Sequence, residues 1–135
     1  MVGILLITHG ALGESLVQCA AHVLASHPLR MQHIAVNRDD APELVRVRAL
    51  ECIRQLDAGD GVLLLTDMLG ATPSNIATRL VMPGRVEAVA GVNLPMLIRA
   101  ITYREQALAA LVRKAVSGGI DGVVHIQPER LHAAS

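Results

Sequence analysis

A histidine and an aspartate each stand just after a short apolar segment of this sequence. His9 follows the largely apolar residues 1–7 and one threonine, and Asp67 follows the run 62–65 and one threonine. A short apolar segment beside a helical pattern is typical of a strand buried on both faces of a parallel sheet. Ligand sites of such sheets lie at the carboxyl ends of the strands. We therefore expect the side chains of His9 and Asp67 to meet at that edge.

A histidine that is hydrogen-bonded to an aspartate has three chemical uses. The carboxylate accepts from one ring nitrogen and fixes the tautomer, which leaves the other nitrogen as a base, a nucleophile or a metal ligand. No other histidine falls at the end of a predicted strand, so a metal site lacks ligands, and we expect neither a metal nor another cofactor. The nucleophile elbow of hydrolases, the dinucleotide fingerprint and the P-loop are all missing. The interpretation that remains is that His9 acts as a nucleophile.

Two predicted helix starts would hold the group that His9 attacks. One helix follows Gly10, and another begins at Thr72, which we expect to be its N-cap, with Pro73 at the first helical position. The free N–H groups and the positive dipole end of a helix bind anions without any Lys or Arg. Gly10 and Gly70 would let the backbone approach the anion closely. A nucleophilic histidine beside such an anion site describes a phosphohistidine carrier.

The candidate site residues fall into three groups. His9 and Asp67 are the predicted catalytic pair. The predicted phosphate contacts are Gly10, Gly70, Ala71 and Thr72, and the residues expected to line the site are Thr8, Thr66 and Asn93. Structural roles compete with three of these assignments. Asp67 would also cap its own loop, Thr72 would start a helix in any case, and Asn93 would cap the helix that follows it.

Strand and helix patterns alternate along the chain and predict an α/β fold. Helical patterns cover about 12–26, 40–56, 72–80 and 93–116, the last with a break near Tyr103. Strand patterns cover 1–7, 34–36 with Met31 leading in, 62–66, 86–89 and 120–126. Asp40 and Glu43 would form a capping box for the second helix.

This alternation predicts a single doubly wound domain with a mostly parallel sheet in the flavodoxin-like order 2-1-3-4. Right-handed crossovers place helices on both faces, and residues 120–126 would add a short fifth strand at one edge. In this order the switch point lies between the strands that end at His9 and at Asp67, so topology and chemistry point to the same place.

Composition narrows the class of protein. The 135 residues are 52% hydrophobic, with no Phe or Trp and a single Tyr, so the core must be aliphatic. Zero formal net charge provides no electrostatic footprint for nucleic acid. No apolar run approaches the ~20 residues of a membrane span. The start of the chain lacks the features of a signal peptide, so we expect a cytoplasmic protein. Cys19 and Cys52 are expected to be reduced thiols packed in the core.

Three motifs together resemble the IIA component of the mannose family of the bacterial sugar phosphotransferase system. They are Thr8-His-Gly10, the loop from Thr66-Asp67 through Gly70-Ala-Thr-Pro-Ser-Asn75, and Ala90-Gly-Val-Asn-Leu-Pro-Met96. Each stands at the carboxyl end of a predicted strand. The resemblance extends to about residue 126, which predicts a IIA domain over residues 1–126 and a C-terminal tail over residues 127–135.

The resemblance implies a phosphocarrier. In that family the histidine of the first motif accepts a phosphoryl group from HPr and passes it to a IIB component. His9 would therefore carry the group on Nε2, and Asp67 would hold the other ring nitrogen. The resemblance also implies a homodimer, a IIB acceptor on a separate chain, and contact with the membrane only through a permease complex. Ala71 and Thr72 stand where the family usually has Gly and Ser, and Leu69 stands where an aromatic residue is common.

Other functions remain open at the level of sequence. The carrier would serve either sugar uptake or regulation. The related phosphocarrier subunit of dihydroxyacetone kinase shares the fold and the chemistry. From a different class, a non-enzymatic flavodoxin-like module would bind a small anion at the same switch point and signal through dimer contacts. Such a module would tolerate His9→Gln, whereas a carrier would lose its activity.

Overall fold

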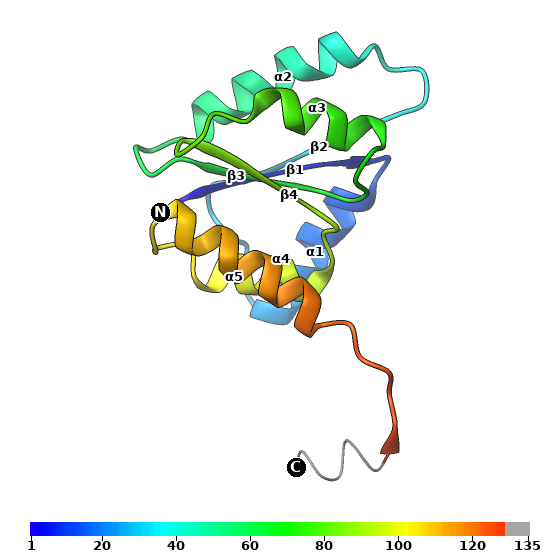
Figure 1. Ribbon diagram of the computed structural model, residues 1–135, viewed down its shortest axis with the longest axis vertical. Coiled ribbons are helices and arrows are strands. Elements are labelled where there is room, and N and C mark those ends of the chain that lie inside the picture. The colour runs from blue at the N-terminus through cyan, green and yellow to red at the C-terminus, as the bar shows by residue number, and fades with distance from the viewer. Residues whose placement is uncertain (129–135) are drawn as a thin grey trace.

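The computed structural model describes residues 1–128 and contains one parallel β-sheet with helices on both faces (Figure 1). The strands are β1 (Gly3–His9), β2 (Met31–Val36), β3 (Val62–Thr66) and β4 (Val86–Ala90). Their order in the sheet is β2-β1-β3-β4, with every neighbouring pair parallel, which confirms the predicted flavodoxin-like order.

Five helices form the two outer layers. One face carries α1 (Leu12–Leu24), α4 (Leu94–Thr102) and α5 (Leu108–Asp121), and the other carries α2 (Pro42–Leu56) and α3 (Thr72–Leu80). The predicted break near Tyr103 is confirmed, because the chain leaves α4 there before α5 begins. Of the tail predicted at 127–135, residues 129–135 lie outside the described part of the chain, and the division into domain and tail stays a prediction.

Both faces of the sheet are buried because the central strands β1 and β3 are almost wholly apolar. Leu5, Ile7 and Leu64 pack toward α2 and α3, whereas Ile4 and Leu6 pack toward α1, α4 and α5. All five side chains are completely buried. Each contributes roughly 1.5–3 kcal/mol by leaving water. The two core layers therefore hold the carboxyl ends of β1 and β3 at fixed positions.

The fifth strand predicted at 120–126 is wrong. Its first residues belong to the end of α5, and the rest adopt no regular structure. Gly118 and Gly119, a pair that usually ends a helix, lie instead against α4. A Cβ built on Gly118 would lie 2.9 Å from the Cβ of Arg99, and one built on Gly119 would lie 2.8 Å from the Cε of Met96. The glycines allow α4 and α5 to pack closely, and the helix continues through them.

Two helices begin differently from the prediction. No side chain caps α2, which starts at Pro42. Asp40 instead accepts a hydrogen bond from the N–H of Asn37 at 2.8 Å, so the predicted capping box is wrong. Thr72 is the first residue of α3, and Ala71 takes the N-cap position assigned to Thr72. In both cases the helix start is set by the turn that precedes it.

The two cysteines occupy different environments. Cys52 is half-buried beside the core between the sheet and α2, and this burial raises the pKa of its thiol. Cys19 is exposed on α1, so the prediction of a core thiol is wrong at that position. The reason is that α1 buries only two small residues, Gly13 and Ala20, and therefore packs on the sheet through a narrow face.

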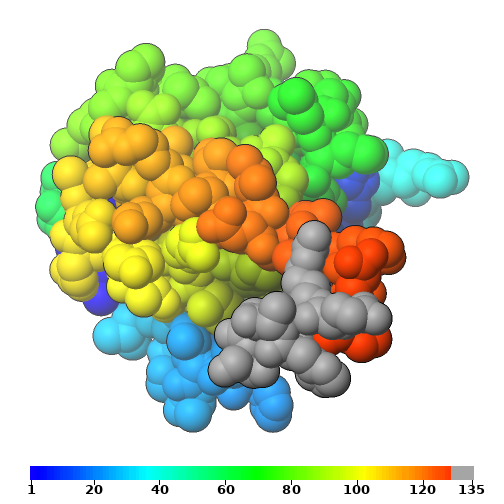
Figure 2. All heavy atoms as spheres, turned by 60° about the horizontal axis from the view of Figure 1, so that its bottom comes forward, coloured from blue at the N-terminus to red at the C-terminus, as the bar shows by residue number. Residues whose placement is uncertain are grey.

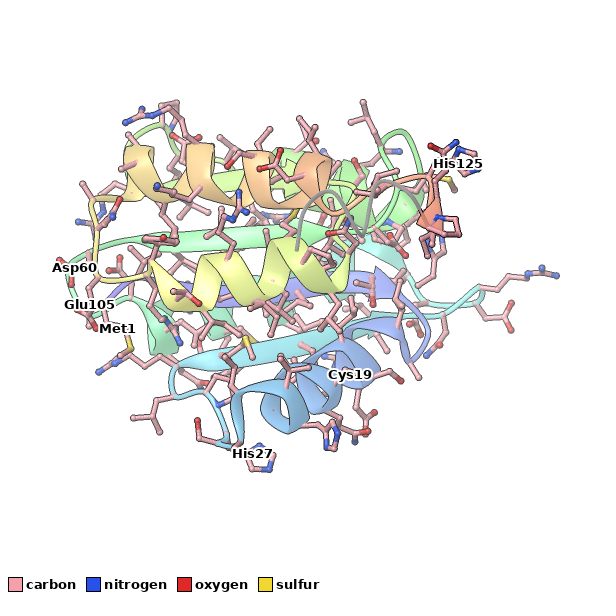
Figure 3. All side chains as sticks on the ribbon, turned by 90° about the horizontal axis from the view of Figure 1, so that it is seen from below. Met1, Cys19, His27, Asp60, Glu105 and His125 are labelled. Carbon is pink, nitrogen blue, oxygen red and sulfur yellow. The ribbon has the colours of Figure 1, made fainter. Side chains whose placement is uncertain are left out.

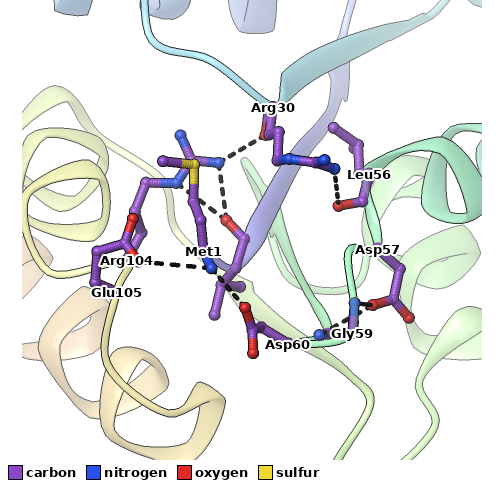
Figure 4. A network of polar contacts seen from close by, with 10 residues as sticks. Met1, Arg30, Leu56, Asp57, Gly59, Asp60, Arg104 and Glu105 are labelled. Atoms are coloured by element: carbon purple, nitrogen blue, oxygen red, sulfur yellow. Dashed lines mark hydrogen bonds and ion pairs between the residues drawn. The ribbon is translucent and has the colours of Figure 1, made fainter.

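Arg104, in the loop between α4 and α5, donates hydrogen bonds to backbone carbonyls at the amino edge of the sheet (Figure 4). Its side chain is 4% exposed. The guanidinium donates to the carbonyl of Val2 at 2.8 and 3.0 Å, to that of Leu29 at 2.5 Å and to that of Arg30 at 2.7 Å. Burial lowers the pKa of this guanidinium. One side chain thus joins the segments that lead into β1 and β2.

A further polar cluster lies at the same edge. The amino group of Met1 pairs with Asp60 at 2.5 Å and with Glu105 at 3.6 Å. These three residues lie together at one end of the molecule, and His125 lies at the other end (Figure 3). Since Met1 precedes β1 and His9 closes it, the candidate site belongs to the edge opposite this cluster.

Candidate functional site

His9 and Asp67 meet at the carboxyl edge of the sheet. Strands β1 and β3 are parallel neighbours with Ile7 paired to Thr66, so each of the two residues extends just beyond the paired region. The Oδ2 of Asp67 accepts a hydrogen bond from the backbone N–H of His9 at 3.0 Å, and the ring Nδ1 of His9 lies 2.8 Å from the same oxygen. The contact expected from the two apolar runs is present.

The contact fixes the chemistry of the imidazole. A carboxylate only accepts hydrogen bonds, so Nδ1 donates to Asp67, and in the neutral imidazole the lone pair is then on Nε2. Asp67 is 11% exposed and His9 is 52% exposed, so the carboxylate is sheltered while the ring faces solvent. Partial burial would raise the pKa of Asp67, but the hydrogen bonds from the backbone and ring of His9 outweigh burial and lower this pKa. The arrangement fixes the orientation of the ring and leaves Nε2 without a hydrogen bond in residues 1–128.

The loop after Asp67 carries two N–H groups that make no hydrogen bond within residues 1–128, and one of them belongs to Thr72, which lines a cleft with His9. The Oδ1 of Asp67 accepts from the N–H of Met68 at 3.0 Å, which anchors the start of the loop. Gly70 has φ +89°, a left-handed conformation that glycine adopts without strain. The N–H groups of Gly70 and Thr72 donate to no acceptor within residues 1–128, whereas that of Ala71 donates to the carbonyl of Met68 at 3.2 Å.

A cleft of about 520 Å³ opens beside the imidazole. It lies between the end of β1, the loop from β2 to α2, and the start of α3. Its lining consists of His9, Val36, Asn37, Arg38, Asp40, Pro42 and Thr72. The cleft is therefore lined both by His9, the predicted nucleophile, and by Thr72, a predicted phosphate contact. It also contains a loop that the sequence analysis did not connect with the site.

The sequence prediction missed the residues of that loop that line the cleft, Arg38 among them. The available signal was its position directly after β2, since all carboxyl ends of a parallel sheet share one edge.

Of the predicted site residues, Thr8 and Gly10 make hydrogen bonds that stabilise the fold, and Thr66 is buried. The hydroxyl of Thr8 accepts a hydrogen bond from the N–H of Gly13 at 2.8 Å and so anchors the start of α1. Gly10 has φ +47°, and its N–H donates to the carbonyl of Val36 at 3.0 Å, which joins the end of β1 to the end of β2. Thr66 is 2% exposed, and its hydroxyl has no hydrogen-bond partner among residues 1–128.

Asn93 lies at the end of β4 and is engaged at both ends of its amide. Its Oδ1 accepts from the N–H of Met96 at 2.9 Å, which confirms the expected cap of α4, and its Nδ2 donates to the carbonyl of Gly119 at 3.1 Å. It lines a pocket between β4 and α5 that does not include His9. The structure therefore places Asn93 in the scaffold of α4 and α5.

Residues 1–128 contain neither a membrane-spanning helix nor a cluster of metal ligands. No helix in this range combines the length and the apolar character required to traverse a bilayer. No three side chains of His, Cys, Asp or Glu in this range are grouped so that they could hold a metal ion.

The chain matches a family model and several characterised proteins. The EIIA-man model, described as "PTS system fructose IIA component", matches residues 3–116. The mannose-specific EIIAB component of the phosphotransferase system of Escherichia coli K12 is 30% identical over 137 residues, which cover 99% of this chain and 42% of that protein. The chain thus spans about two fifths of that relative.

Solved structures agree with this match. The EIIA component from Streptococcus agalactiae superposes with a TM-score of 0.82 at 25% identity, over 93% of this chain and 97% of that one. The mannose/sorbose-specific IIA subunit from Enterococcus faecalis shares the fold with a TM-score of 0.81 at 22% identity, over 93% and 95% of the two chains. The family match over most of the chain, together with this fold and its histidine at the switch point, leads to one conclusion. The chain belongs to the mannose family of IIA components of the phosphotransferase system.

Proposed function

We propose that the protein is a phosphohistidine carrier, which accepts a phosphoryl group from HPr on Nε2 of His9 and passes it to a IIB component. The observation that carries the proposal is the orientation of the imidazole. Asp67 holds Nδ1 at 2.8 Å and leaves Nε2 unbonded at the mouth of the cleft. Membership of the family is consistent with this role.

The transfer step uses the groups that surround the histidine. The Nε2 lone pair attacks phosphorus, the new N–P bond forms as the N–P bond of the donor breaks, and the donor imidazole leaves with the electron pair. The phosphorylated ring keeps the proton on Nδ1 and carries positive charge, which the carboxylate of Asp67 balances. The free N–H groups of Gly70 and Thr72 are suited to the phosphoryl oxygens. The protein positions the reactants and stabilises charge.

The partners in this proposal need a surface around the cleft. Leu12, Met68 and Leu69 are exposed at the carboxyl edge, on the segments that flank His9 and Asp67. Exposed apolar side chains beside a polar site are suited to transient docking of another protein. We propose that HPr and a IIB protein on a separate chain dock in turn on this apolar rim, so that each brings its reactive group in line with Nε2.

The proposal extends to a cytoplasmic homodimer that meets a membrane only through a permease complex. Sedimentation at micromolar concentration tests the homodimer, for which a species of one chain would contradict the assignment.

Intact-protein mass after incubation with phosphoenolpyruvate, enzyme I and HPr tests the carrier. We expect the wild type to gain one acid-labile, base-stable phosphoryl group. His9→Ala should gain none, and His22→Ala, which removes an exposed histidine of α1, should behave as wild type. No gain in the wild type, with an HPr proven active, would contradict the proposal and favour the anion-binding module.

A further inference from the structure

Arg38 extends from a turn that is held beside His9. In the parallel pairing of β1 with β2, His9 lies level with Val36, so Arg38 follows two residues beyond the position of the nucleophile. The turn is closed by two hydrogen bonds between the same residues. The N–H of Asp40 donates to the carbonyl of Asn37 at 3.0 Å, and the N–H of Asn37 donates to the Oδ2 of Asp40 at 2.8 Å. Arg38 stands at the first corner of this turn.

The turn projects from the body of the molecule beside the cleft. The segment between β2 and α2, coloured cyan, stands out from the surface in the space-filling view (Figure 2). Arg38 is exposed and lines the same cleft as His9 and Thr72. A long, flexible side chain at the rim of an open cleft can swing over the group that occupies the cleft.

The negative charges around the cleft would be stabilised by a nearby cation. Asp67 holds the imidazole, Asp40 lines the cleft, and a phosphoryl group would add further negative charge. Arg38 is the only Arg or Lys in the lining, and its guanidinium makes no hydrogen bond or ion pair with residues 1–128. By contrast, Arg46 of the neighbouring helix α2 is held by Glu43 at 2.5 Å. The basic side chain that lines the cleft with His9 is therefore not paired with any carboxylate of residues 1–128.

We propose that Arg38 binds the phosphoryl oxygens at His9 and stabilises their charge during transfer, a role that rests on the proposed phosphocarrier function. The Nε2–P bond forms as the bond to the donor breaks, negative charge spreads over the three phosphoryl oxygens, and the guanidinium keeps all its protons. Its planar fork donates two parallel hydrogen bonds to such a group, a geometry that an ammonium cannot reproduce. Arg38 completes an anion site whose other donors are the N–H groups of Gly70 and Thr72.

Phosphoramidate, a small phosphoryl donor that labels histidine, separates this role from docking. No partner protein is present in this reaction, so a residue that only contacts HPr cannot affect the rate. The variants are Arg38→Ala, Arg38→Lys and Arg38→Glu in the full chain. Arg48→Ala serves as the matched control, because Arg48 is exposed on α2, has no ion pair within residues 1–128 and does not line the cleft.

We expect Arg38→Ala to slow labelling of His9 by roughly tenfold or more. This is less than the roughly 100- to 1,000-fold of a buried oxyanion donor, because water screens the open cleft. Arg38→Lys should recover part of the rate, Arg38→Glu should be slowest, and Arg48→Ala should match the wild type. The same order should appear in kcat when HPr is the donor.

Three results would overturn the inference. Labelling of Arg38→Ala within twofold of the wild type would exclude a phosphoryl contact. An effect on KM for HPr alone, with normal phosphoramidate labelling, would assign Arg38 to docking. An equal loss of labelling rate in the Arg48→Ala control would show that the effect comes from the net charge of the protein and not from a contact made by Arg38. Failure of the carrier function itself is distinguishable, because the wild type would then take no phosphoryl group from HPr whichever residue stood at position 38.

Discussion

The Oδ2 atom of Asp67 accepts two hydrogen bonds from His9, one from the backbone N–H at 3.0 Å and one from the ring Nδ1 at 2.8 Å. The same oxygen thus fixes both the end of β1 and the orientation of the imidazole. The other oxygen, Oδ1, is held by the N–H of Met68 at 3.0 Å, so the carboxylate cannot rotate freely. The proposed reaction at Nε2 would depend on this arrangement.

Asp67→Asn should slow phosphorylation of His9 by roughly 10- to 100-fold, the usual effect of removing the partner that orients a functional imidazole. The amide keeps the shape but neither the charge nor the acceptor-only character of the carboxylate. Phosphoramidate labelling followed by intact mass measures the rate. Asp121→Asn, which removes an exposed carboxylate paired with Arg99, is the control and should label normally. A normal rate in Asp67→Asn would show that the ring needs no orienting carboxylate.

The lowered pKa of Asp67 makes a prediction for stability against pH. A carboxyl group whose pKa is lower in the folded than in the unfolded protein stabilises the fold above the unfolded pKa, about 3.9. That contribution is lost as the pH falls through the folded pKa. The difference in unfolding free energy between wild type and Asp67→Asn should therefore narrow as the pH falls below about 4. Urea titrations across this range measure it, and a difference that widens in acid would contradict the sign.

Leu69→Asp should weaken phosphoryl transfer from HPr while the fold stays intact. Leu69 is 80% exposed, so the change removes an apolar contact from the proposed rim without disturbing the core. Leu29→Asp is the matched control, since Leu29 is 73% exposed and stands before β2, at the opposite edge of the sheet from the cleft. The expected result is a raised KM for HPr in Leu69→Asp alone, with normal phosphoramidate labelling. Unchanged transfer from HPr would refute the docking role.

Gly118→Ala should destabilise the protein, although Ala is the better helix former by about 1 kcal/mol. The new methyl group would lie 2.9 Å from the Cβ of Arg99, an atom fixed to the backbone of α4. Overpacking of this kind costs about 1–3 kcal/mol. At Gly119 the nearest atom is the terminal Cε of Met96, which can move, so Gly119→Ala should be close to neutral. Urea unfolding of both variants tests the contrast, and equal effects would contradict it.

Arg104→Lys should cost about 2–4 kcal/mol of unfolding free energy, because an ammonium cannot reach the three carbonyls of Val2, Leu29 and Arg30 in the fork geometry. Arg113→Lys, an exposed change on α5, should be neutral. Since Arg104 lies at the amino edge, phosphoramidate labelling of the folded variant should remain normal. Unaltered stability would mean that water or neighbouring groups replace the lost hydrogen bonds.

The sheet order and the pairing of His9 with Asp67 could be predicted because both depend on simple patterns. Buried parallel strands are apolar on both faces, and residues that follow two neighbouring strands share one edge. The prediction of a fifth strand failed because Gly118 and Gly119 allow α4 to pack closely on α5. In the sequence alone, a glycine pair with this role looks the same as a glycine pair that ends a helix.

Details of the loops were harder to predict. Asp is a favoured N-cap residue, so the sequence predicted that Asp40 caps α2. In the structure its side chain instead closes the turn that carries Arg38. The hydrogen bonds of Gly10 and Ala71 also could not be anticipated, since the N–H of Gly10 donates to the carbonyl of Val36 in β2 and that of Ala71 donates to the carbonyl of Met68 within its own loop. Which amides remain free for a ligand follows from three-dimensional neighbours and not from the motif.

The separation of 58 residues between His9 and Asp67 has a consequence for synthesis. His9 is synthesised before Asp67, which follows only with β3, and β3 pairs with β1 across a long stretch of sequence. Forming such a pairing closes a long loop and is a late, cooperative event in folding. A chain that ends before β3 therefore carries the histidine without its orienting carboxylate, and phosphoramidate should label His9 of such a fragment more slowly than His9 of the folded protein.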